Sequence, residues 1–593
     1  MNYPSENLAL LRAALKRNSI DAYIIPYADP HLGENIQDHW QIIRWLTGFD
    51  GSAGTVVVTD TFAGLWTDSR YFIQAEKQLA GTDFKLVKQG PGGNNDYVDW
   101  LSENIGSRKK IAVDGRIFSI TSYKKLETRL AYKMVNIDFK CDLISEIWSD
   151  QPGLPSFTAF DHPAEFSGKD RSLKIKEVRD EMKRLHVNYH LLTSCDDIMW
   201  LLNIRGSDVP YSPLLTSFAI VGEEQVLFFT GYNKIPAYLA AVLEKLGIVI
   251  MPYEECSGIF PSFAEGSVIL LTPGTTSASL YYSIPDFLKI SEGVSIPSRM
   301  KAIKNKTEIE NIGKVMVRDG VAMTKFFYWI ETSIGQFPVT EILLSGRLLE
   351  IRSKLEEFLG PSFAAIVAFN EHAALPHYTA SSGTDSEIGE NGILLVDSGG
   401  QYKGGTTDIT RTISVGLPTL RQKTDFTLVL KGHISLAMSK FPLGTRGYQL
   451  DILARKPLWD SGLNYGHGTG HGVGYCLNVH EGPQNISPAD NKTIIEPGML
   501  ISNEPAIYRE GEYGIRTENL IICYEDEETD FGQFLKFDTV SLCYIDKSLI
   551  DKSLLVQDEI DWLNSYHSEV YEKLSPHLNE KEKQWLKAKT EPI

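Results

Sequence analysis

The chain has 593 residues, about four typical domain lengths, so its length alone favours two to four domains. Apolar residues make up 42% and charged residues 23%, which is typical of a soluble globular enzyme and excludes a disordered or fibrous chain. The formal net charge of −18 disfavours binding to nucleic acid or to anionic membranes, because like charges repel.

The N-terminal stretch 1–23 carries Glu6 and Asn7 where a secretory signal needs basic and then apolar residues. The most apolar stretch, 237–253, is interrupted by Glu244 and Lys245, so no membrane span is expected. The six cysteines are scattered without a Cys-x-x-Cys pair, which disfavours a zinc cluster or a dense disulfide framework. These features predict a soluble, cytoplasmic protein.

Two parts of the N-terminal half repeat one pattern. Residues 15–27 (LKRNSIDAYIIPY) and 182–194 (MKRLHVNYHLLTS) each read as a helix end running into a strand. Further on, WLTGFDGS (45–52) is echoed by WLLNIRGS (200–207), and a β-branched run follows each. A chance helix–strand echo is the alternative, but the shared offset between the WL and GS positions favours duplication.

The repeats predict two related α/β domains, residues 1–153 and 154–298, with their boundary in the Gly/Pro-rich stretch 150–157. A third domain, residues 299–593, is expected to alternate helices with strands that glycines punctuate. Its first long helix has a candidate capping box at Thr307 and Glu310, ahead of apolar residues at helical spacing.

Chemistry-bearing residues concentrate in the third domain, beginning with residues 391–416. This segment predicts two strands around a glycine-rich turn, and a turn centred on Tyr402 and Lys403 would place Asp397 opposite Asp408. Opposed like charges destabilise a hairpin unless a cation lies between them, so the pair favours a divalent metal. Each aspartate by itself could equally be a turn residue.

Six of the 13 histidines fall between residues 372 and 480, and three of them lie in the glycine-rich segment 464–483. So much glycine excludes a helix, so the spacing of His467 and His471 is not that of a helical zinc motif. A neutral imidazole is a common metal ligand, and the other two histidines could act on substrate. Taken singly, each of His467, His471 and His480 could be a packed or surface residue.

Two glutamates complete the set. Glu504 is expected at the end of the apolar strand in 497–508, and Glu518 within the strand in 514–523, where an unpaired charge is costly. Arg516 shares a strand face with Glu518, so a salt bridge between them is the alternative to metal binding. Both can hold together, because an arginine can orient a ligating carboxylate.

The candidate ligands are four carboxylates and one imidazole, an oxygen-rich set that suits manganese among first-row metals. Two divalent cations would carry +4 against −4 from the carboxylates, whereas an empty site would force some carboxylates to take up protons. The five residues are Asp397, Asp408, His471, Glu504 and Glu518.

The ordered series AALPHY, LLVDSGGQYKGGTTDITRT, HGTGHGVGYCLNVHEGP, ISNEPAIY and GIRTENLII resembles the metal-dependent aminopeptidase P family. These are X-Pro aminopeptidases, and the similarity is to their long, three-domain cytosolic form. It extends along the whole chain, from WLTGFDGSAGT to DEIDWLNSYH. The resemblance implies two related creatinase-like α/β domains followed by a C-terminal pita-bread catalytic domain of the α+β class.

The resemblance also implies roles for single residues. Asp397 would bind one metal, His471 and Glu504 the other, and Asp408 and Glu518 both. Outside the ligands, it implies substrate contacts for three histidines and an orienting role for an arginine: His377, His467, His480 and Arg516. His372 and His433 match no family position and are expected to be structural.

The implied reaction is removal of the first residue from a peptide that has proline second and a free N-terminus. A hydroxide bridging two metal ions, most simply Mn²⁺, would attack the carbonyl before proline. Glu504 would pass a proton to the leaving nitrogen, and His377 and His480 would stabilise the oxyanion. The family form further implies a homodimer.

Three alternatives remain on the same fold. A prolidase would cleave only X-Pro dipeptides, but two domains ahead of the catalytic one match the aminopeptidase arrangement better. A creatinase-type hydrolase needs no metal, and a non-catalytic binding module could lose its ligands freely. All five candidate ligands are present in this sequence, which disfavours both of these.

Overall fold

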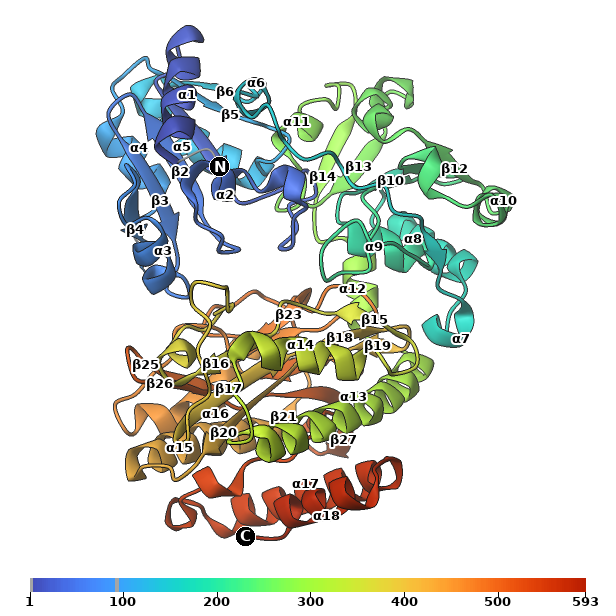
Figure 1. Cartoon of the computed structure of the whole chain (residues 1–593). Coiled ribbons are helices and arrows are strands. Elements are labelled where there is room, and N and C mark those ends of the chain that lie inside the picture. Colours follow the sequence, from blue (N-terminus) through green and yellow to red (C-terminus); the bar gives the residue numbers. More distant parts are fainter. Residues whose placement is uncertain (1–3, 91–94) are drawn as a thin grey trace. The chain divides into compact units, whose positions relative to one another are not determined.

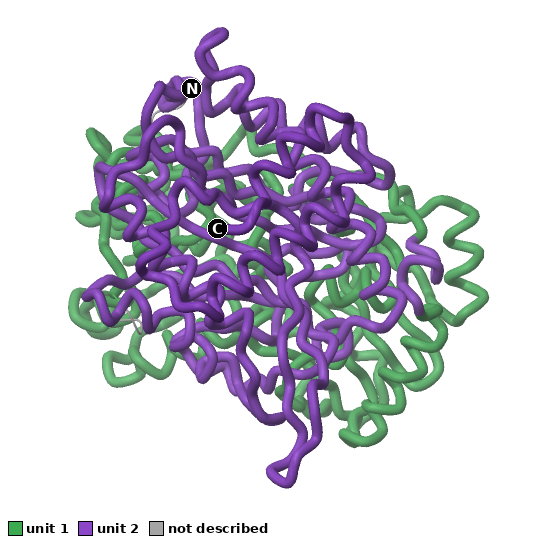
Figure 2. The backbone as a smooth tube through the Cα atoms, turned by 90° about the horizontal axis from the view of Figure 1, so that it is seen from below, with its two compact units in different colours: residues 1–161, 169–210, 214–297 green, residues 162–168, 211–213, 298–593 purple. Residues whose placement is uncertain are grey.

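The computed structural model describes residues 4–90 and 95–593. The chain forms two compact units (Figures 1 and 2). Unit 1 comprises residues 1–161, 169–210 and 214–297, and unit 2 comprises residues 162–168, 211–213 and 298–593. Unit 2 holds every candidate site residue.

Unit 1 contains two six-stranded sheets, each with its own buried apolar clusters. The first sheet has the order β4-β3-β2-β1-β5-β6: β1 (Ala22–Pro26), β2 (Thr55–Thr59), β3 (Ala63–Thr67), β4 (Lys85–Lys88), β5 (Lys110–Val113) and β6 (Asn136–Asp138). Its helices are α1 (Pro4–Arg17), α2 (Ile42–Thr47), α3 (Phe72–Gln78), α4 (Tyr97–Asn104), α5 (Ile120–Leu130) and α6 (Ile144–Ile147).

The second sheet has the order β12-β11-β10-β8-β13-β14: β8 (Tyr189–Leu192), β10 (Phe218–Val221), β11 (Val226–Phe229), β12 (Ile248–Met251), β13 (Val268–Leu271) and β14 (Lys289–Glu292). Its helices are α8 (Arg171–Arg184), α9 (Cys195–Leu202), α10 (Ala237–Lys245) and α11 (Ala278–Tyr281). A short ribbon pairs β7 (Phe160–Asp161) with β9 (Ile204–Arg205).

The two sheets share one topology, which confirms the prediction of two related α/β domains. In each, the first strand pairs antiparallel with the second and parallel with the fifth (β1 with β2 and β5; β8 with β10 and β13). The repeated WL positions lie in the last turn of matching helices: α2 is capped by Gly48 and α9 by Asn203, both in the left-handed conformation. Glycine and asparagine are the residues that most readily adopt this helix-terminating conformation.

Unit 2 opens with α12 (Ile296–Ala302), which begins in unit 1, and the long α13 (Lys306–Ser333). The predicted capping box at Thr307 and Glu310 was wrong by two residues. Asn305 caps α13 by accepting from the Glu308 N–H, and the Glu308 carboxylate accepts from the Asn305 N–H. Asparagine is as good a cap as threonine, so the sequence offered two boxes, and the earlier one forms.

The sheets of unit 2 surround its core cluster. The largest, β21-β28-β27-β24-β22-β23, comprises β21 (Lys440–Pro442), β22 (Gly470–Gly472), β23 (Glu481–Ile486), β24 (Leu500–Asn503), β27 (Asn519–Thr529) and β28 (Gly532–Thr539). The smaller ones comprise β15 (Phe358–Pro361), β16 (Ile366–Phe369), β17 (Gly392–Ser398), β18 (Gly400–Tyr402), β19 (Gly405–Thr406), β20 (Ile409–Val415), β25 (Ala506–Arg509) and β26 (Tyr513–Arg516).

Helices cover these sheets, and α17 and α18 pack against α13 (Figure 1). The helices are α7 (Ala164–Ser167), α14 (Glu341–Arg352), α15 (Leu420–Ala437), α16 (Gly447–Trp459), α17 (Gln557–Leu574) and α18 (Glu580–Thr590). Across residues 4–90 and 95–593, no helix is both long enough and apolar enough to cross a bilayer.

The predicted opposition of Asp397 and Asp408 was wrong by two residues. β17 pairs with β20 so that Asp397 lies opposite Thr410, because the turn falls at Lys403 and the following glycine. The chain leaves the ladder at Gly399, where a Cβ would come 1.9 Å from the Thr407 carbonyl oxygen. A two-residue shift preserves the face of every side chain, so Asp397 and Asp408 still point the same way.

Candidate metal centre

The five candidate ligands come from different strands of unit 2, and all but His471 lie at or just beyond a strand end. Asp397 is the penultimate residue of β17, and Asp408 lies between β19 and β20. His471 is in the middle of β22, Glu504 follows β24, and Glu518 lies in the short connection from β26 to β27. Strand ends are free of ladder geometry, so residues far apart in sequence can converge on one point.

In each of two groups of three residues, the three ligand atoms lie within 4.8 Å of one another, and both groups include Glu518. One group is Asp397, Asp408 and Glu518, and the other is His471, Glu504 and Glu518. His471 Nε2 lies 3.4 Å from Asp408 Oδ2 and 3.6 Å from Glu504 Oε1, so the two groups are contiguous. The structure therefore brings all five candidates together.

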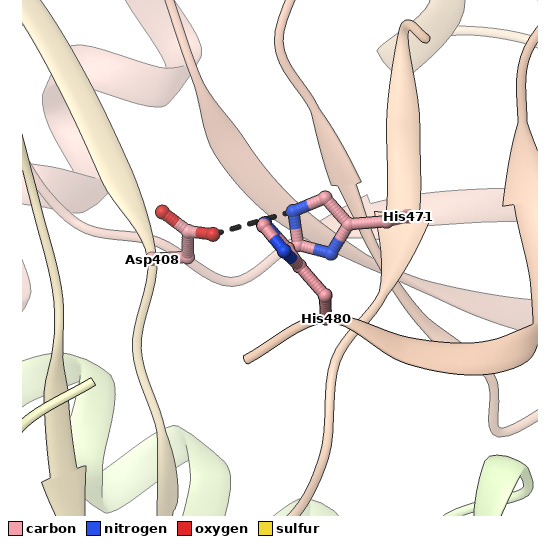
Figure 3. A group of neighbouring side chains, drawn as sticks. All are labelled: Asp408, His471 and His480. Atoms are coloured by element: carbon pink, nitrogen blue, oxygen red, sulfur yellow. Dashed lines mark ion pairs between the residues drawn. The ribbon is translucent and has the colours of Figure 1, made fainter. Parts of the chain in front are cut away.

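The same cluster extends to His480, whose ring centroid lies 4.2 Å from that of His471 in an edge-on arrangement. A third group of ligand atoms within 4.8 Å is formed by Asp408, His471 and His480. Figure 3 shows the His471 ring turned toward Asp408, with the exposed His480 beside it.

Protonation at this cluster is strongly perturbed. Desolvation raises the pKa of Glu518 well above its usual range, and the neighbouring Asp408 and Glu504 raise it further. Desolvation likewise raises the pKa of Glu504 to about 7, although His471 opposes the shift. The Glu504 side chain is 19% exposed. Desolvation also raises the pKa of Asp397, against the opposing charge of Arg516.

One buried acceptor at this cluster has no hydrogen-bond partner among the described residues, namely Asp397 Oδ1. Buried carboxylates without partners are costly, and crowded ones repel, so positive charge is needed here. Hard oxygen donors with one imidazole are suited to divalent cations. The residues present therefore fit two divalent metal ions.

Arg516 links the cluster to two residues that the sequence analysis did not select. It donates to Asp397 Oδ2, to Thr410 Oγ1 at 3.1 Å and to the Tyr508 hydroxyl at 2.6 Å. Thr410 in turn donates to Glu518 Oε2 at 2.7 Å. Thr410 and Tyr508 lie within segments that resemble the family, but threonine and tyrosine are common in strands. Only their contacts distinguish them from other strand residues.

His467 is locked by this network. Because the Tyr508 hydroxyl accepts from Arg516, its own proton is available to His467 Nε2 at 2.8 Å, while His467 Nδ1 faces the Gly468 carbonyl at 2.7 Å. Desolvation, then Arg516 and more weakly His377, lowers the pKa of His467 to about 3. The hydrogen-bond network thus assigns His467 as a neutral imidazole with both ring nitrogens engaged.

The glycine-rich loop is anchored to α16 by an ion pair. Arg455 donates to Asp451 Oδ2 at 2.6 Å, to the Tyr465 carbonyl at 2.8 Å and to the His467 carbonyl at 2.6 Å. Thr469 donates to Asp451 Oδ1 at 2.7 Å. The part of the loop that carries His467 is therefore held by buried charges rather than by regular structure of its own.

Three further histidines of the third domain, His372, His377 and His433, have different surroundings. His377 is half-buried and lies just after the 3₁₀ turn η7 (Asn370–Ala374). The pKa of His467 is lowered mainly by burial, and His377 lies near enough to add to that lowering. His433 is buried, with Nδ1 3.0 Å from the Asn503 carbonyl, and Asn519 lies 3.1 Å from Nε2. His372 lies 2.9 Å from Glu341. The last two have structural partners.

Comparison with family models defines the class of protein. The creatinase/prolidase N-terminal domain matches residues 8–142 and 150–308, metallopeptidase family M24 matches 310–525, and the C-terminal region of peptidase M24 matches 533–593. This order agrees with two related N-terminal domains followed by a catalytic metallopeptidase domain. The predicted boundaries after residues 153 and 298 stay predictions.

Full-length relatives narrow the class. A probable Xaa-Pro aminopeptidase P of Talaromyces marneffei is 39% identical over 99% of this chain and 92% of its own. Xaa-Pro aminopeptidase 1 of Dictyostelium discoideum is 36% identical over 99% and 96%. The chain therefore belongs to the Xaa-Pro aminopeptidase P family of M24 metallopeptidases.

Solved structures agree. The crystal structure of X-prolyl aminopeptidase from Caenorhabditis elegans, described as a cytosolic enzyme with a di-nuclear active site, is 34% identical. It covers 100% of both chains with a TM-score of 0.96. A prolidase from Thermococcus sibiricus, 23% identical with a TM-score of 0.50, covers 64% of this chain and 98% of its own and shows a shared fold alone.

Proposed function

We propose that this chain removes the first residue from peptides that carry proline at the second position and a free N-terminus. The convergence of four carboxylates and His471 on one point of unit 2 is the observation that carries the proposal. Full-length relatives named Xaa-Pro aminopeptidases support it over a dipeptide-specific prolidase.

In this proposal Asp397 binds one metal ion, His471 and Glu504 bind the other, and Asp408 and Glu518 bind both. The membership of Glu518 in two ligand groups supports its shared role. The oxygen-rich donor set favours Mn²⁺. When bound, such ions lower the pKa of water and polarise a carbonyl oxygen, which is the chemistry that amide hydrolysis needs.

The chain's own residues supply the remaining steps. Glu504 takes the proton of the attacking water and delivers it to the nitrogen of the leaving proline. That nitrogen belongs to a tertiary amide without an N–H, so shape must select proline. His480 and His377 donate to the oxygen that becomes negative, and one such donor typically contributes about 2.7 to 4 kcal/mol.

In this proposal Arg516 positions a metal ligand, and His467 contacts the substrate without exchanging a proton with it. Arg516 orients Asp397 through its hydrogen bond, as outer partners of metal ligands commonly do. His467 has both ring nitrogens engaged, so it presents a neutral, rigid ring to the substrate rather than a proton.

We also infer a cytoplasmic homodimer. The relative from Caenorhabditis elegans is described as cytosolic, and the family resemblance implies the dimer. Light scattering after size-exclusion chromatography measures the dimer directly, and a mass of 66.4 kDa, that of one chain, would contradict it.

The decisive experiment measures bound metal and hydrolysis together. Purified protein is analysed for metal by mass spectrometry and incubated with Arg-Pro-Pro-Gly and, separately, with Arg-Pro. Release of arginine from the tetrapeptide, in protein with about two ions per chain, is expected. Cleavage of Arg-Pro alone would instead assign a prolidase, and metal-free protein without activity would favour a binding module.

A further inference from the structure

Glu341 is a completely buried carboxylate outside the metal centre, with an exposed fraction of 0%. It is the first residue of α14. Its oxygens accept from two backbone N–H groups, Phe369 at 2.8 Å and Ser386 at 3.1 Å. They also accept from the Tyr378 hydroxyl at 2.8 Å and lie 2.9 and 3.0 Å from His372 Nδ1.

These four partners all belong to one segment, residues 369–386, which runs from the last residue of β16 into the connection to β17. Phe369 and Ser386 are its two ends, and His372 and Tyr378 flank His377. A single carboxylate therefore holds the segment at both ends and on both sides of that histidine. Besides this carboxylate, the far end of the segment is held by a backbone hydrogen bond from the Glu341 N–H to the Ser386 carbonyl at 3.1 Å and by a bridge between Thr340 and Glu387.

The segment also packs against the hairpin that carries Arg516. η7 packs against β26, the strand that ends at Arg516. The approach is so close that a Cβ at Gly514 would come 1.7 Å from the Ala373 carbonyl oxygen. The segment is thus seated between Glu341 and β26, with little room to shift.

The carboxylate is suited to this task by charge as well as by geometry. It lies in the first turn of α14, where the helix dipole favours a negative group. Hydrogen bonds to a charged acceptor are about twice as strong as neutral ones. The rings of His372 and Tyr378 stack at 4.4 Å, which aligns both donors toward Glu341. This gives His372, which matches no family motif, a defined partner.

We propose that Glu341 is a positioning residue that fixes residues 369–386 and, with them, His377. The catalytic part of this inference rests on the proposed function, because it takes His377 to contact the substrate. The structural part, that one buried carboxylate organises the segment, stands on the contacts alone.

The first test is hydrogen–deuterium exchange of the full-length protein carrying Glu341→Gln. Glutamine retains the shape but replaces one of the two acceptor oxygens by an NH2 donor, so the backbone amide that loses its acceptor, Phe369 or Ser386, is expected to exchange at least tenfold faster. The matched control is Glu350→Gln on the same helix, where the carboxylate is exposed and pairs with Arg347 and Lys354. Unchanged exchange in Glu341→Gln would overturn the inference whatever the protein's activity.

The second test is a double-mutant cycle on Arg-Pro-Pro-Gly hydrolysis. Glu341→Gln is expected to lower kcat/KM about 10- to 100-fold, mainly through kcat, as for other residues that orient catalytic groups. In a His377→Ala background the same change should alter kcat/KM less than about twofold, because its target is already gone. Multiplying effects would overturn the positioning role.

Two milder variants keep the inference testable if Glu341→Gln fails to fold. Tyr378→Phe removes only the hydroxyl, and His372→Asn retains a shorter side-chain N–H donor. Tyr378→Phe should accelerate exchange of residues 369–386 and lower kcat several-fold, with His372→Asn closer to wild type. Inactive wild-type protein would count against the proposed function, while the exchange results would still decide whether Glu341 holds the segment.

Discussion

Two buried acidic sites in unit 2 are built in opposite ways. Glu481 is 3% exposed and lies 3.0 Å from Lys301 Nζ and 2.8 Å from Lys304 Nζ, so its charge is met by cations of the chain. The metal centre contains four carboxylates, and the ion pair that Arg516 forms is with one of them, Asp397. A buried acid matched by protein cations is structural, whereas a surplus of acids indicates a cation from outside.

The contrast is thermodynamic as well as geometric. Removing one partner of a buried pair leaves an uncompensated charge, so the Glu481 cluster should govern stability. Neutralising one of the four carboxylates at the metal centre relieves charge repulsion. Such a change should therefore lower activity but, in the absence of metal, cost little stability. Separate changes at the two sites can test this division.

The largest expected effect is loss of activity when metal is removed. Dialysis against a chelator should abolish arginine release from Arg-Pro-Pro-Gly, and Mn²⁺ should restore it. The four carboxylates of the metal centre outnumber the cationic side chains that contact them, so hydrolysis depends on metal ions from solution. Circular dichroism should show that the fold survives. Full hydrolysis by protein shown to be metal-free would contradict the division.

Glu504→Gln is expected to lower kcat by about 10² to 10⁴, the usual contribution of a general acid–base. Stability should change little, since a neutral amide relieves repulsion among the acids. Stopped assays on Arg-Pro-Pro-Gly and denaturant titrations measure the two effects. Glu510→Gln, exposed in the neighbouring hairpin turn, is the matched control and should behave as wild type.

Lys304→Met should do the reverse. Loss of one cation from the Glu481 cluster is expected to lower the free energy of unfolding by about 3 kcal/mol. Bound metal per folded chain should stay at the wild-type level. Urea denaturation and metal analysis of the folded fraction check both statements, and metal loss without destabilisation would reverse the assignment of the two sites.

The smallest effect, measured between pH 7.5 and 5.5, concerns a buried neutral group in unit 1. Burial lowers the pKa of His190 to about 4, against a hydrogen bond to the Leu270 carbonyl. The unfolded chain protonates this histidine near pH 6.5, and the folded chain only near pH 4, so folding stability falls as pH drops through that window. The integrated loss is about 3 kcal/mol, and less than half of it is reached by pH 5.5.

Denaturant titrations of wild type and His190→Gln at pH 7.5, 5.5 and 4.5 isolate that contribution. The wild type should lose more stability than the variant over this range. Parallel pH dependence in the two proteins would show that His190 is not the group responsible.

Much of the site could be selected from sequence because its signals are chemical and local. Charged residues within apolar strands, and histidines among glycines, violate ordinary patterns, and Asp397, His471 and Glu504 were found this way. The faces of Asp397 and Asp408 also followed from alternation, although the register did not. A two-residue slip leaves the same faces buried, so the pattern could not distinguish the two pairings.

From the sequence alone, the repeats predicted two related α/β domains and the motifs predicted the acidic surplus, while the fold of the catalytic domain was implied by the family resemblance. Only the tertiary structure decided which partners those residues meet. It showed that Tyr508 hydrogen-bonds to His467, that Thr410 contacts Glu518, and that Glu341 accepts hydrogen bonds from residues 369–386. The physical reason is that a hydrogen bond requires two groups at one place, and for residues far apart in the chain the packing of whole elements decides that.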